Sequence, residues 1–253
     1  MLLAFSFAKR DFKERYVGTG LGQLWYILSP IVMIFIYTVI FSDFMKMKLD
    51  IVDSAYSYSI YIVPGLLSWI SFSATLRSLS TLIEKKSNLI KKINVPMYVF
   101  YISEVIIESF LLLLSLCLGI VFLLLINYTV DATFLWILPI IFFQMIFVFS
   151  LGIIISLFVP FFKDIKEAIP VIIQLWFWAT PIIYMKEMIA DKYPLILVYN
   201  PFYHFVHLYQ DIFVYAKPPS FSDIFIIFML SFFAFILAAY LYKKMINTIK
   251  DVI

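Results

Sequence analysis

The sequence has little charge, little glycine and almost no cysteine. Only 14% of its 253 residues are charged, whereas soluble domains average about 25%. A single cysteine, Cys117, excludes a fold held by disulfides, and six glycines exclude a fibrous one. Because 64% of the residues are hydrophobic, a soluble sphere of this size could not bury them all. A water-soluble enzyme is therefore excluded.

Motifs for nucleotide binding and hydrolysis are also missing. The chain has no G-x-x-x-x-G-K-[ST] loop for ATP phosphates, no G-x-S-x-G, no H-E-x-x-H and no Cys/His zinc spacing. Gly18, Gly20 and Gly22 superficially resemble a glycine-rich loop, but they follow no strand and open a long apolar run, which indicates a flexible elbow. We expect no catalytic residue, metal or cofactor in this chain. A net charge of +3 is too small to indicate nucleic acid.

Six apolar runs approach or exceed the roughly 20 residues that a helix needs to cross a bilayer. The second run is diluted by serine, and the fifth is interrupted by Pro170 and Pro181. No repeat, linker or low-complexity tract divides the chain. The sequence predicts an all-α integral membrane protein with one transmembrane domain over residues 1–253, and its spans are expected at about 21–43, 56–77, 98–126, 133–159, 166–185 and 221–243.

The distribution of lysine and arginine predicts the orientation. With the N-terminus inside, fourteen of these residues fall in inner segments and five in outer ones, so both termini are expected in the cytosol. Residues 1–19 are expected to form an amphipathic helix in the interface plane, because the charges from Lys9 to Arg15 lie opposite an apolar face. That face contains Met1, Phe5, Ala8, Phe12 and Tyr16. A basic tail without a structural role is the alternative.

Two clusters of ionisable residues need an explanation. Glu104 and Glu108 lie four residues apart in the third span, and we expect them at its cytosolic end, interfacial or paired; a proton relay is the alternative. His204, His207 and Asp211 share one helical face. A polar stripe on a gate helix is favoured there over a metal site with three weak ligands.

Two spans carry stripes that combine polar groups, aromatic rings and prolines. A polar stripe on a membrane helix faces either a partner helix or a water-filled path. Both packing and lining of a conduit therefore remain open. The first stripe consists of Gln23, Tyr26, Pro30, Tyr37 and Phe41, and the second of Glu167, Pro170, Gln174, Trp178 and Pro181.

Several ordered motifs resemble one family of membrane proteins. Residues 9–37, KRDFKERYVGTGLGQLWYILSPIVMIFIY, resemble the N-terminus of the membrane subunits of ABC exporters for bacterial polysaccharides, most of all the O-antigen exporters, with capsule and teichoic acid exporters close. Further matches are IVPGLLSWISFSATLRS (62–78), SNLIKKINVP (87–96), TPIIY (180–184) and YNP (199–201). The sequence departs from the family pattern at Val95-Pro96-Met97, where Phe and Arg often flank the proline, and at Ser68, where proline is common.

The resemblance implies a half-transporter that works as a homodimer in the bacterial inner membrane and exports a lipid-linked polysaccharide. Two copies of a cytosolic ATP-binding subunit would hold ATP and Mg²⁺. The cytosolic loop 78–97 would contain a coupling helix whose contact residues are Ser87, Asn88, Leu89 and Ile90. The outer gate loop 186–220 would form short re-entrant helices at 187–193 and 202–215, with Phe202, Tyr203, His204, His207 and Tyr209 at the gate.

Two alternatives to polysaccharide export remain. An exporter of drugs or lipids would have the same fold, and an integral-membrane glycan or acyl transferase would belong to a different class. Aromatic residues make up 20% of the chain. Their rings could stack on sugar faces along a conduit, but aromatic belts at the two membrane interfaces, together with packing, account for at least half of them.

Overall fold

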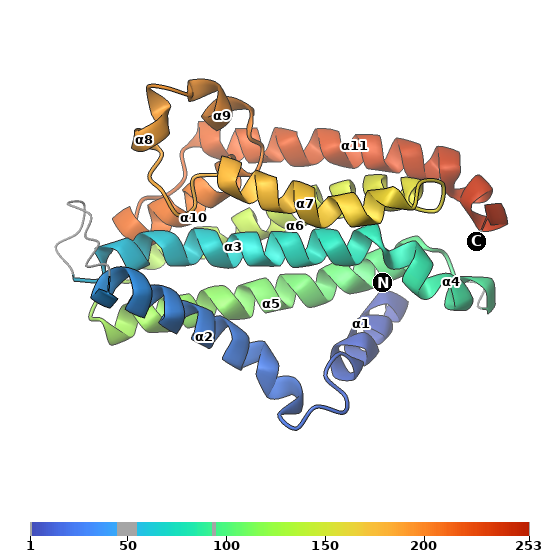
Figure 1. Cartoon of the computed structure of the whole chain (residues 1–253), viewed down its shortest axis with the longest axis horizontal. Helices are drawn as coiled ribbons and strands as arrows, with labels where there is room; N and C mark the ends of the chain where they lie inside the picture. The colour runs from blue at the N-terminus through green and yellow to red at the C-terminus, as the bar shows by residue number, and fades with distance from the viewer. Residues whose placement is uncertain (1, 45–54, 93–94, 253) are drawn as a thin grey trace.

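The computed structural model describes residues 2–44, 55–92 and 95–252, which form helices and turns without a strand (Figure 1). The expected all-α class is therefore confirmed. The long helices run along the long axis of the molecule. They are α2 (Trp25–Thr38), α3 (Ser57–Ser80), α5 (Tyr98–Leu125), α6 (Ile137–Phe158), α7 (Asp164–Ala179) and α11 (Phe221–Val252).

Among the described residues, five helical segments are long and apolar enough to cross a membrane. They are Gly22–Ser42, Ser57–Ser80, Tyr98–Leu125, Ala132–Phe158 and Phe221–Ile249. The first contains a 3₁₀ turn at Gly22–Leu24, and α6 is preceded by another at Ala132–Trp136. Beyond α2, Val39–Phe44 form a wider helical turn. These segments coincide with five of the six predicted runs.

The sixth predicted run, 166–185, contains a shorter helix than expected. α7 has 16 residues and ends at Ala179. Thr180 is extended, with φ −105° and ψ 127°. The ring of Pro181 disfavours the helical conformation for the residue before it, so the helix ends here.

Helix α3 is the centre of the bundle and packs against α5, α6 and α10. In its most apolar window 89% of the residues are buried. Three of the hydroxyls that dilute its hydropathy are satisfied within the helix, since Ser73, Thr75 and Ser80 each donate a 2.7 Å hydrogen bond to the carbonyl four residues earlier. Small residues of this kind let neighbouring helices approach closely.

Two glycines lie where helices approach most closely. A Cβ atom added at Gly152 of α6 would lie 2.5 Å from the Cβ of Leu79 on α3. A Cβ added at Gly65 would lie 3.1 Å from Cγ1 of Val206 on α10. The contact between α3 and α6 therefore depends on the absence of a side chain at position 152.

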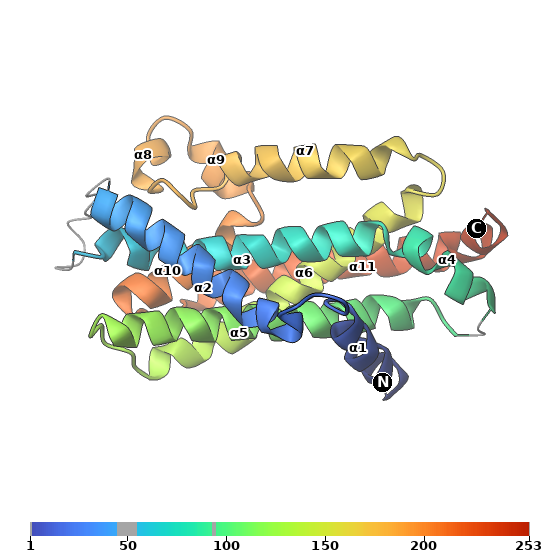
Figure 2. The same cartoon turned by 60° about the horizontal axis from the view of Figure 1, so that its bottom comes forward.

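The N-terminal helix α1 (Leu2–Glu14) packs against α5 and turns into α2 through a glycine elbow (Figure 2). Ala4 and Ala8 are buried, whereas Phe5 is 61% exposed. Gly18 and Gly22 have φ angles of 87° and 52°, in the left-handed region that glycine adopts readily. The predicted helix and elbow are both present.

The segment between α7 and α11 contains three short helices, α8 (Glu187–Ala190), α9 (Pro194–Tyr199) and α10 (Tyr203–Tyr215). α8 lies within the expected 187–193, and α10 within the expected 202–215. α10 packs against α3, α6 and α11, and its apolar side chains are buried in the main core. A 13-residue helix is too short to cross a bilayer.

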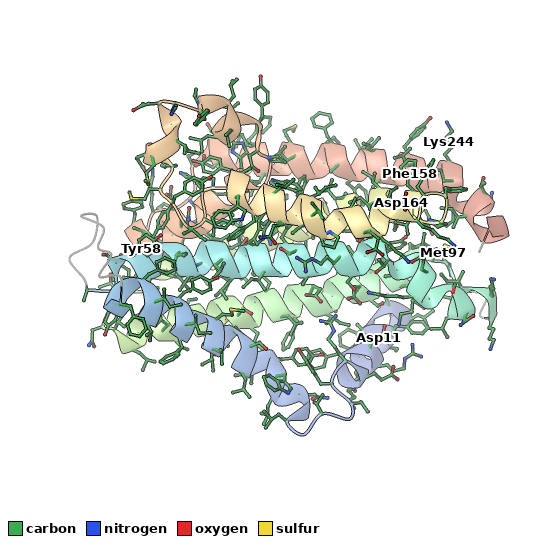
Figure 3. All side chains as sticks on the ribbon, in the orientation of Figure 1. Asp11, Tyr58, Met97, Phe158, Asp164 and Lys244 are labelled. Carbon is green, nitrogen blue, oxygen red and sulfur yellow. The ribbon has the colours of Figure 1, made fainter. Side chains whose placement is uncertain are left out.

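The charged elements gather at one end of the bundle. α1, α4 (Leu82–Lys92), the start of α7 and the end of α11 all lie there (Figure 1). Figure 3 shows Asp11, Asp164 and Lys244 toward that end and Tyr58 toward the opposite one. Lys46 and Lys48, which were counted on the outer side, lie outside the described residues.

We expect Gly152→Ala to destabilise the protein, because the new methyl group would overlap Leu79. Overpacking of this kind costs about 1–3 kcal/mol. The measurement is the thermal unfolding midpoint of the purified protein in detergent. Gly20→Ala is the matched control, because nothing lies within 4 Å of its added Cβ. An unchanged midpoint for Gly152→Ala would contradict the close packing of α3 and α6.

Candidate functional site

The predicted stripe on the first span divides between packed and exposed residues. The ring of Tyr26 stacks on Phe12 at 4.2 Å, and its hydroxyl donates a 2.8 Å hydrogen bond to the Phe12 carbonyl. Tyr37 and Phe41 are half-buried and stack on each other at 5.9 Å. Gln23 is exposed, and Pro30 is half-buried. Much of this stripe therefore packs within the chain.

The stripe on α7 faces outward. Ile169 and Ile173 are buried in the core that includes α3. Glu167, Pro170, Gln174 and Trp178 are all exposed, whereas Pro181, beyond the helix, is buried. The structure thus brings four of the five stripe residues to one free surface of the helix.

Asn200 joins the end of α7 to the start of α10. Its Oδ1 accepts hydrogen bonds from Nε1 of Trp176 at 2.8 Å and from the backbone N–H of Phe202 at 3.1 Å. Its Nδ2 donates to the carbonyl of Ala179 at 3.1 Å and to Oγ1 of Thr180 at 2.8 Å. The TPIIY and YNP motifs, which the sequence gives as separate signatures, therefore meet at one buried amide.

Two of the expected gate residues are core residues of the bundle. Phe202 and Tyr209 are completely buried. The ring of Phe202 lies 4.1 Å from that of Phe72 and 5.2 Å from that of Trp69, both on α3. Tyr203, His204 and His207 are half-buried. The start of α10 is therefore anchored on α3 by aromatic contacts.

His207 lies in a small cluster of charged groups. Its Nε2 is 2.8 Å from Nζ of Lys186 and 3.5 Å from Oδ2 of Asp211. Burial lowers the pKa of His207, and the charge of Lys186 adds to this, while Asp211 and Asp223 oppose it.

The geometry does not bring the two histidines and Asp211 together as metal ligands. Nε2 of His204 lies 3.3 Å from the carbonyl oxygen of Val198 instead. No group of three potential metal ligands is found in the part of the chain that the structure describes.

The two glutamates of the third span are bound by one arginine. Arg15 places Nη2 at 2.9 Å from Oε1 of Glu104 and Nη1 at 2.8 Å from Oε1 of Glu108. Ser78 on α3 donates a further hydrogen bond of 2.5 Å to Glu104. Pairing was one of the two arrangements expected from the sequence, the other being an interfacial position, and it ties the elbow after α1 to α5.

Helix α4 contains the four predicted coupling residues, and it is held by two ion pairs. Lys86 lies 2.8 Å from Asp11 on α1, and Lys166 on α7 lies 3.5 Å from Glu84. Asn88 is exposed. The other three predicted coupling residues are half-buried: Leu89 and Ile90 pack against the smaller core cluster, and the Ser87 hydroxyl donates to the Glu84 carbonyl.

Sequence reasoning missed the roles of Arg15 and Asn200. Arg15 appeared only as one of several basic residues, and its partners are 89 and 93 positions away. Asn200 lies within the YNP motif, but a motif of three letters does not indicate which groups its amide joins. The one available signal was the cost of two unpaired carboxylates in a membrane span, which requires a cation nearby.

Comparisons with known proteins agree with one another. The sequence profile of the family described as "ABC-2 type transporter" matches residues 3–214. Two proteins named O-antigen export system permease protein RfbA, from Klebsiella pneumoniae, are each 31% identical over 207 residues, which cover 81% of this chain and 77% of the relative. A protein of the same name from Myxococcus xanthus is 28% identical over 222 residues, covering 86% and 82%.

We expect His207 to make stability depend on pH. Its pKa is lower in the folded protein than its ordinary value of 6.5, so the unfolded chain binds more protons as the pH falls below 6.5. The stabilisation is present above that pH and is lost as the pH falls toward the folded pKa. Each unit of lowering corresponds to about 1.4 kcal/mol, or about 3–6 °C in the unfolding midpoint.

The measurement is the unfolding midpoint between neutral and mildly acidic pH for the wild type, His207→Gln and the control His204→Gln. We expect His207→Gln to flatten the acid-side decline and His204→Gln to leave it unchanged. Equal slopes for all three proteins would contradict this role of His207.

Proposed function

Because this chain belongs to the ABC-2 type transporter membrane family, we propose that it is the membrane-spanning subunit of an exporter of a lipid-linked polysaccharide of the O-antigen type. The similarity to O-antigen export permeases over more than four fifths of the chain supports the choice of substrate. The observation that carries the mechanism is the exposed polar and aromatic stripe on α7.

The position of that stripe favours a path between two copies of the chain. α3 fills the centre of one protomer, so the stripe faces away from the core. The polar groups of Glu167 and Gln174 along one membrane helix are costly against lipid and suit a water-filled path, and Trp178 adds an aromatic ring to the same surface. In a homodimer, the α7 stripes of the two copies would face each other and, together with parts of α2, would line a conduit. Aromatic rings there would guide the sugars, and polar groups would bind the sugar hydroxyls.

Six crossings account for the arrangement better than five. α1 and the end of α11 lie at the same end of the bundle, which requires an even number of crossings. α7 with residues 180–185 supplies the sixth, and α10 would be a re-entrant helix at the opposite end. The concentration of basic segments at the α1 end supports placing both termini in the cytosol and the protein in the bacterial inner membrane.

Energy would come from a separate ATP-binding subunit, two copies per dimer, because this sequence has no P-loop. α4 lies at the basic end and exposes Asn88, so it is our candidate contact for that subunit. ATP and Mg²⁺ would be bound there and not by this chain. The chain itself would carry no covalent chemistry.

The conduit is tested by the double variant Gln174→Leu and Trp178→Ala. Loss of one aromatic contact worth about 0.5–1.5 kcal/mol corresponds to a fall of about 2- to 13-fold in export. The measurement is ATP-driven polysaccharide export by proteoliposomes that contain the chain and its ATPase. Phe233→Ala, on the exposed face of α11, is the control. Normal glycan export by the double variant would contradict the conduit, and transport of only drugs or lipids would contradict the substrate.

The coupling contact is tested by Asn88→Glu. An unpaired carboxylate buried at an interface costs several kcal/mol, so we expect the ATPase subunit no longer to co-purify. Asn247→Glu is the matched control, because Asn247 is equally exposed and lies in the C-terminal part of α11. Retention of the ATPase by Asn88→Glu would show that α4 is not the docking element.

A further inference from the structure

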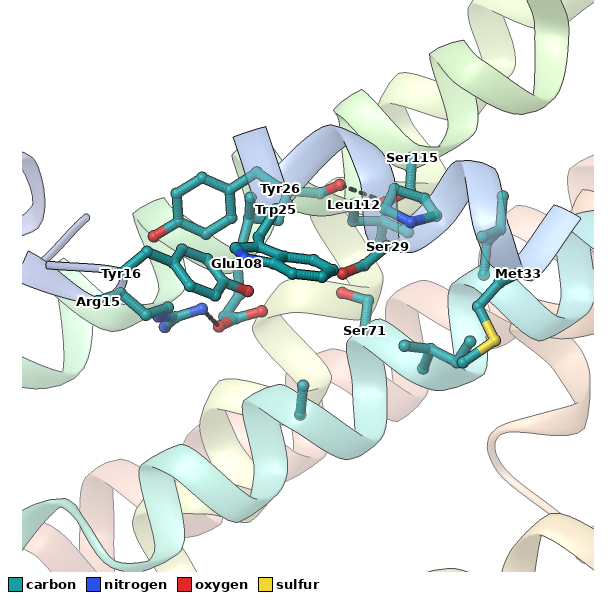
Figure 4. Close-up of a pocket in the computed structure, with 15 residues that line it drawn as sticks. Arg15, Tyr16, Trp25, Tyr26, Ser29, Met33, Ser71, Glu108, Leu112 and Ser115 are labelled. Atoms are coloured by element: carbon teal, nitrogen blue, oxygen red, sulfur yellow. Dashed lines mark hydrogen bonds and ion pairs between the residues drawn. The ribbon is translucent and has the colours of Figure 1, made fainter. Parts of the chain in front are cut away.

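A cavity of about 200 Å³ lies between the elbow that follows α1 and helices α2, α3 and α5 (Figure 4). A single water needs only about 10–15 Å³, whereas pockets for drug-sized ligands measure roughly 300–1,000 Å³. The cavity is therefore suited to one ring of a larger ligand. It is distinct from the α7 stripe.

One side chain in the cavity lacks a partner. Ser71 on α3 is only 8% exposed, and its hydroxyl makes no hydrogen bond within the described structure. Figure 4 shows the hydroxyls of Ser71 and Ser29 on the cavity side, beside the indole of Trp25. A buried hydroxyl without a partner costs about 1–3 kcal/mol. The hydroxyl oxygen itself is buried, so a ligand reaches it when the Ser71 side chain rotates toward the cavity, and the new hydrogen bond then removes this cost.

The charges at the cavity favour a neutral ligand over an anion. Arg15 and Glu108 line it, but the guanidinium is already bound to two carboxylates, those of Glu104 and Glu108. Because one guanidinium is paired with two carboxylates, this cluster has no spare positive charge for a phosphate. The carboxylate of Glu108 can still accept hydrogen bonds from hydroxyl groups.

Aromatic residues complete the lining. Trp25, Tyr16 and Tyr26 border the cavity, and Trp25 is 38% exposed. An aromatic wall with a few placed polar groups is typical of small-molecule sites. Rings that stack on C–H faces, together with hydroxyls and a carboxylate, form the combination that recognises a sugar ring.

We propose that this cavity binds one neutral sugar ring of the transported glycan, next to its lipid anchor. The inference rests on the proposed function. The cavity lies at the level of the elbow between the amphipathic α1 and the first span. The junction between a lipid and its glycan must lie at that level, since the lipid stays in the bilayer and the glycan in water.

The test is a binding titration of the full chain in nanodiscs with octyl β-glucoside below its micellar concentration. Octyl phosphate carries the same alkyl chain on an anionic headgroup, and octanol carries it on a single hydroxyl. We expect saturable binding of the glucoside, weakened about 2- to 13-fold by Ser71→Ala, the effect of one hydrogen bond. Ser71→Ala removes an unpartnered hydroxyl, so folding is not at risk. Ser73→Ala is the control, because Ser73 donates to the Trp69 carbonyl instead.

Equal binding of all three probes would show a site for alkyl chains. Tighter binding of octyl phosphate would show an anion site. No binding of the glucoside would show that the cavity holds water and no sugar ring. Each of these results overturns the proposal. Export assays separate it from the proposed function. If proteoliposomes export polysaccharide and Ser71→Ala neither binds more weakly nor exports more slowly, the sugar site alone fails. If no polysaccharide is exported under any condition, the proposed function fails whatever the titration shows.

Discussion

The structure depends on one constraint: a polar group inside an apolar bundle must find its partner within the protein, because lipid offers none. α3 meets this constraint in two ways. Ser73, Thr75 and Ser80 bond to its own backbone, and Ser68 exchanges two hydrogen bonds with Gln144 of α6, at 3.0 and 3.2 Å. With these polar groups satisfied, α3 can occupy the centre and be covered by α5, α6 and α10. α2 and α7 are then left at the periphery, where they are free to meet a partner.

Hydropathy and helix periodicity predicted most of the long elements. Five helical segments long and apolar enough to cross a membrane are present, with the amphipathic α1 and the glycine elbow. Short helices also lie near 187–193 and 202–215, where the resemblance implied them, and the family inferred from ordered motifs is confirmed. The run predicted for 166–185 contains a helix that ends at Ala179, before Pro181, one of the two prolines that interrupt the run in the sequence. The pairing of Arg15 with Glu104 and Glu108 could not be predicted, because it depends on which helices become neighbours. The local sequence pattern gives no information about contacts between residues about 90 positions apart.

Two ion pairs connect α4 to helices on either side of it. Lys86 links it to Asp11 on α1, and Glu84 links it to Lys166 on α7. Partly exposed pairs of this kind contribute only about 0–1 kcal/mol each. They therefore orient α4 between α1 and the stripe-bearing helix α7 without fixing it. Arg15, bound to two carboxylates, holds the elbow after α1 more firmly to α5.

The burial of α10 has a consequence for how the chain is made. Its side chains pack against α3 and α6, which are synthesised before it, and against α11, which is synthesised after it. α10 is too short to be held in the bilayer as a spanning helix, so its place depends on these neighbours. Its aromatic rings meet partners on elements that are made first: Phe202 packs on Phe72 of α3, and Phe213 on Phe134 ahead of α6. α10 can therefore dock before α11 is synthesised, and α11 then completes its cover.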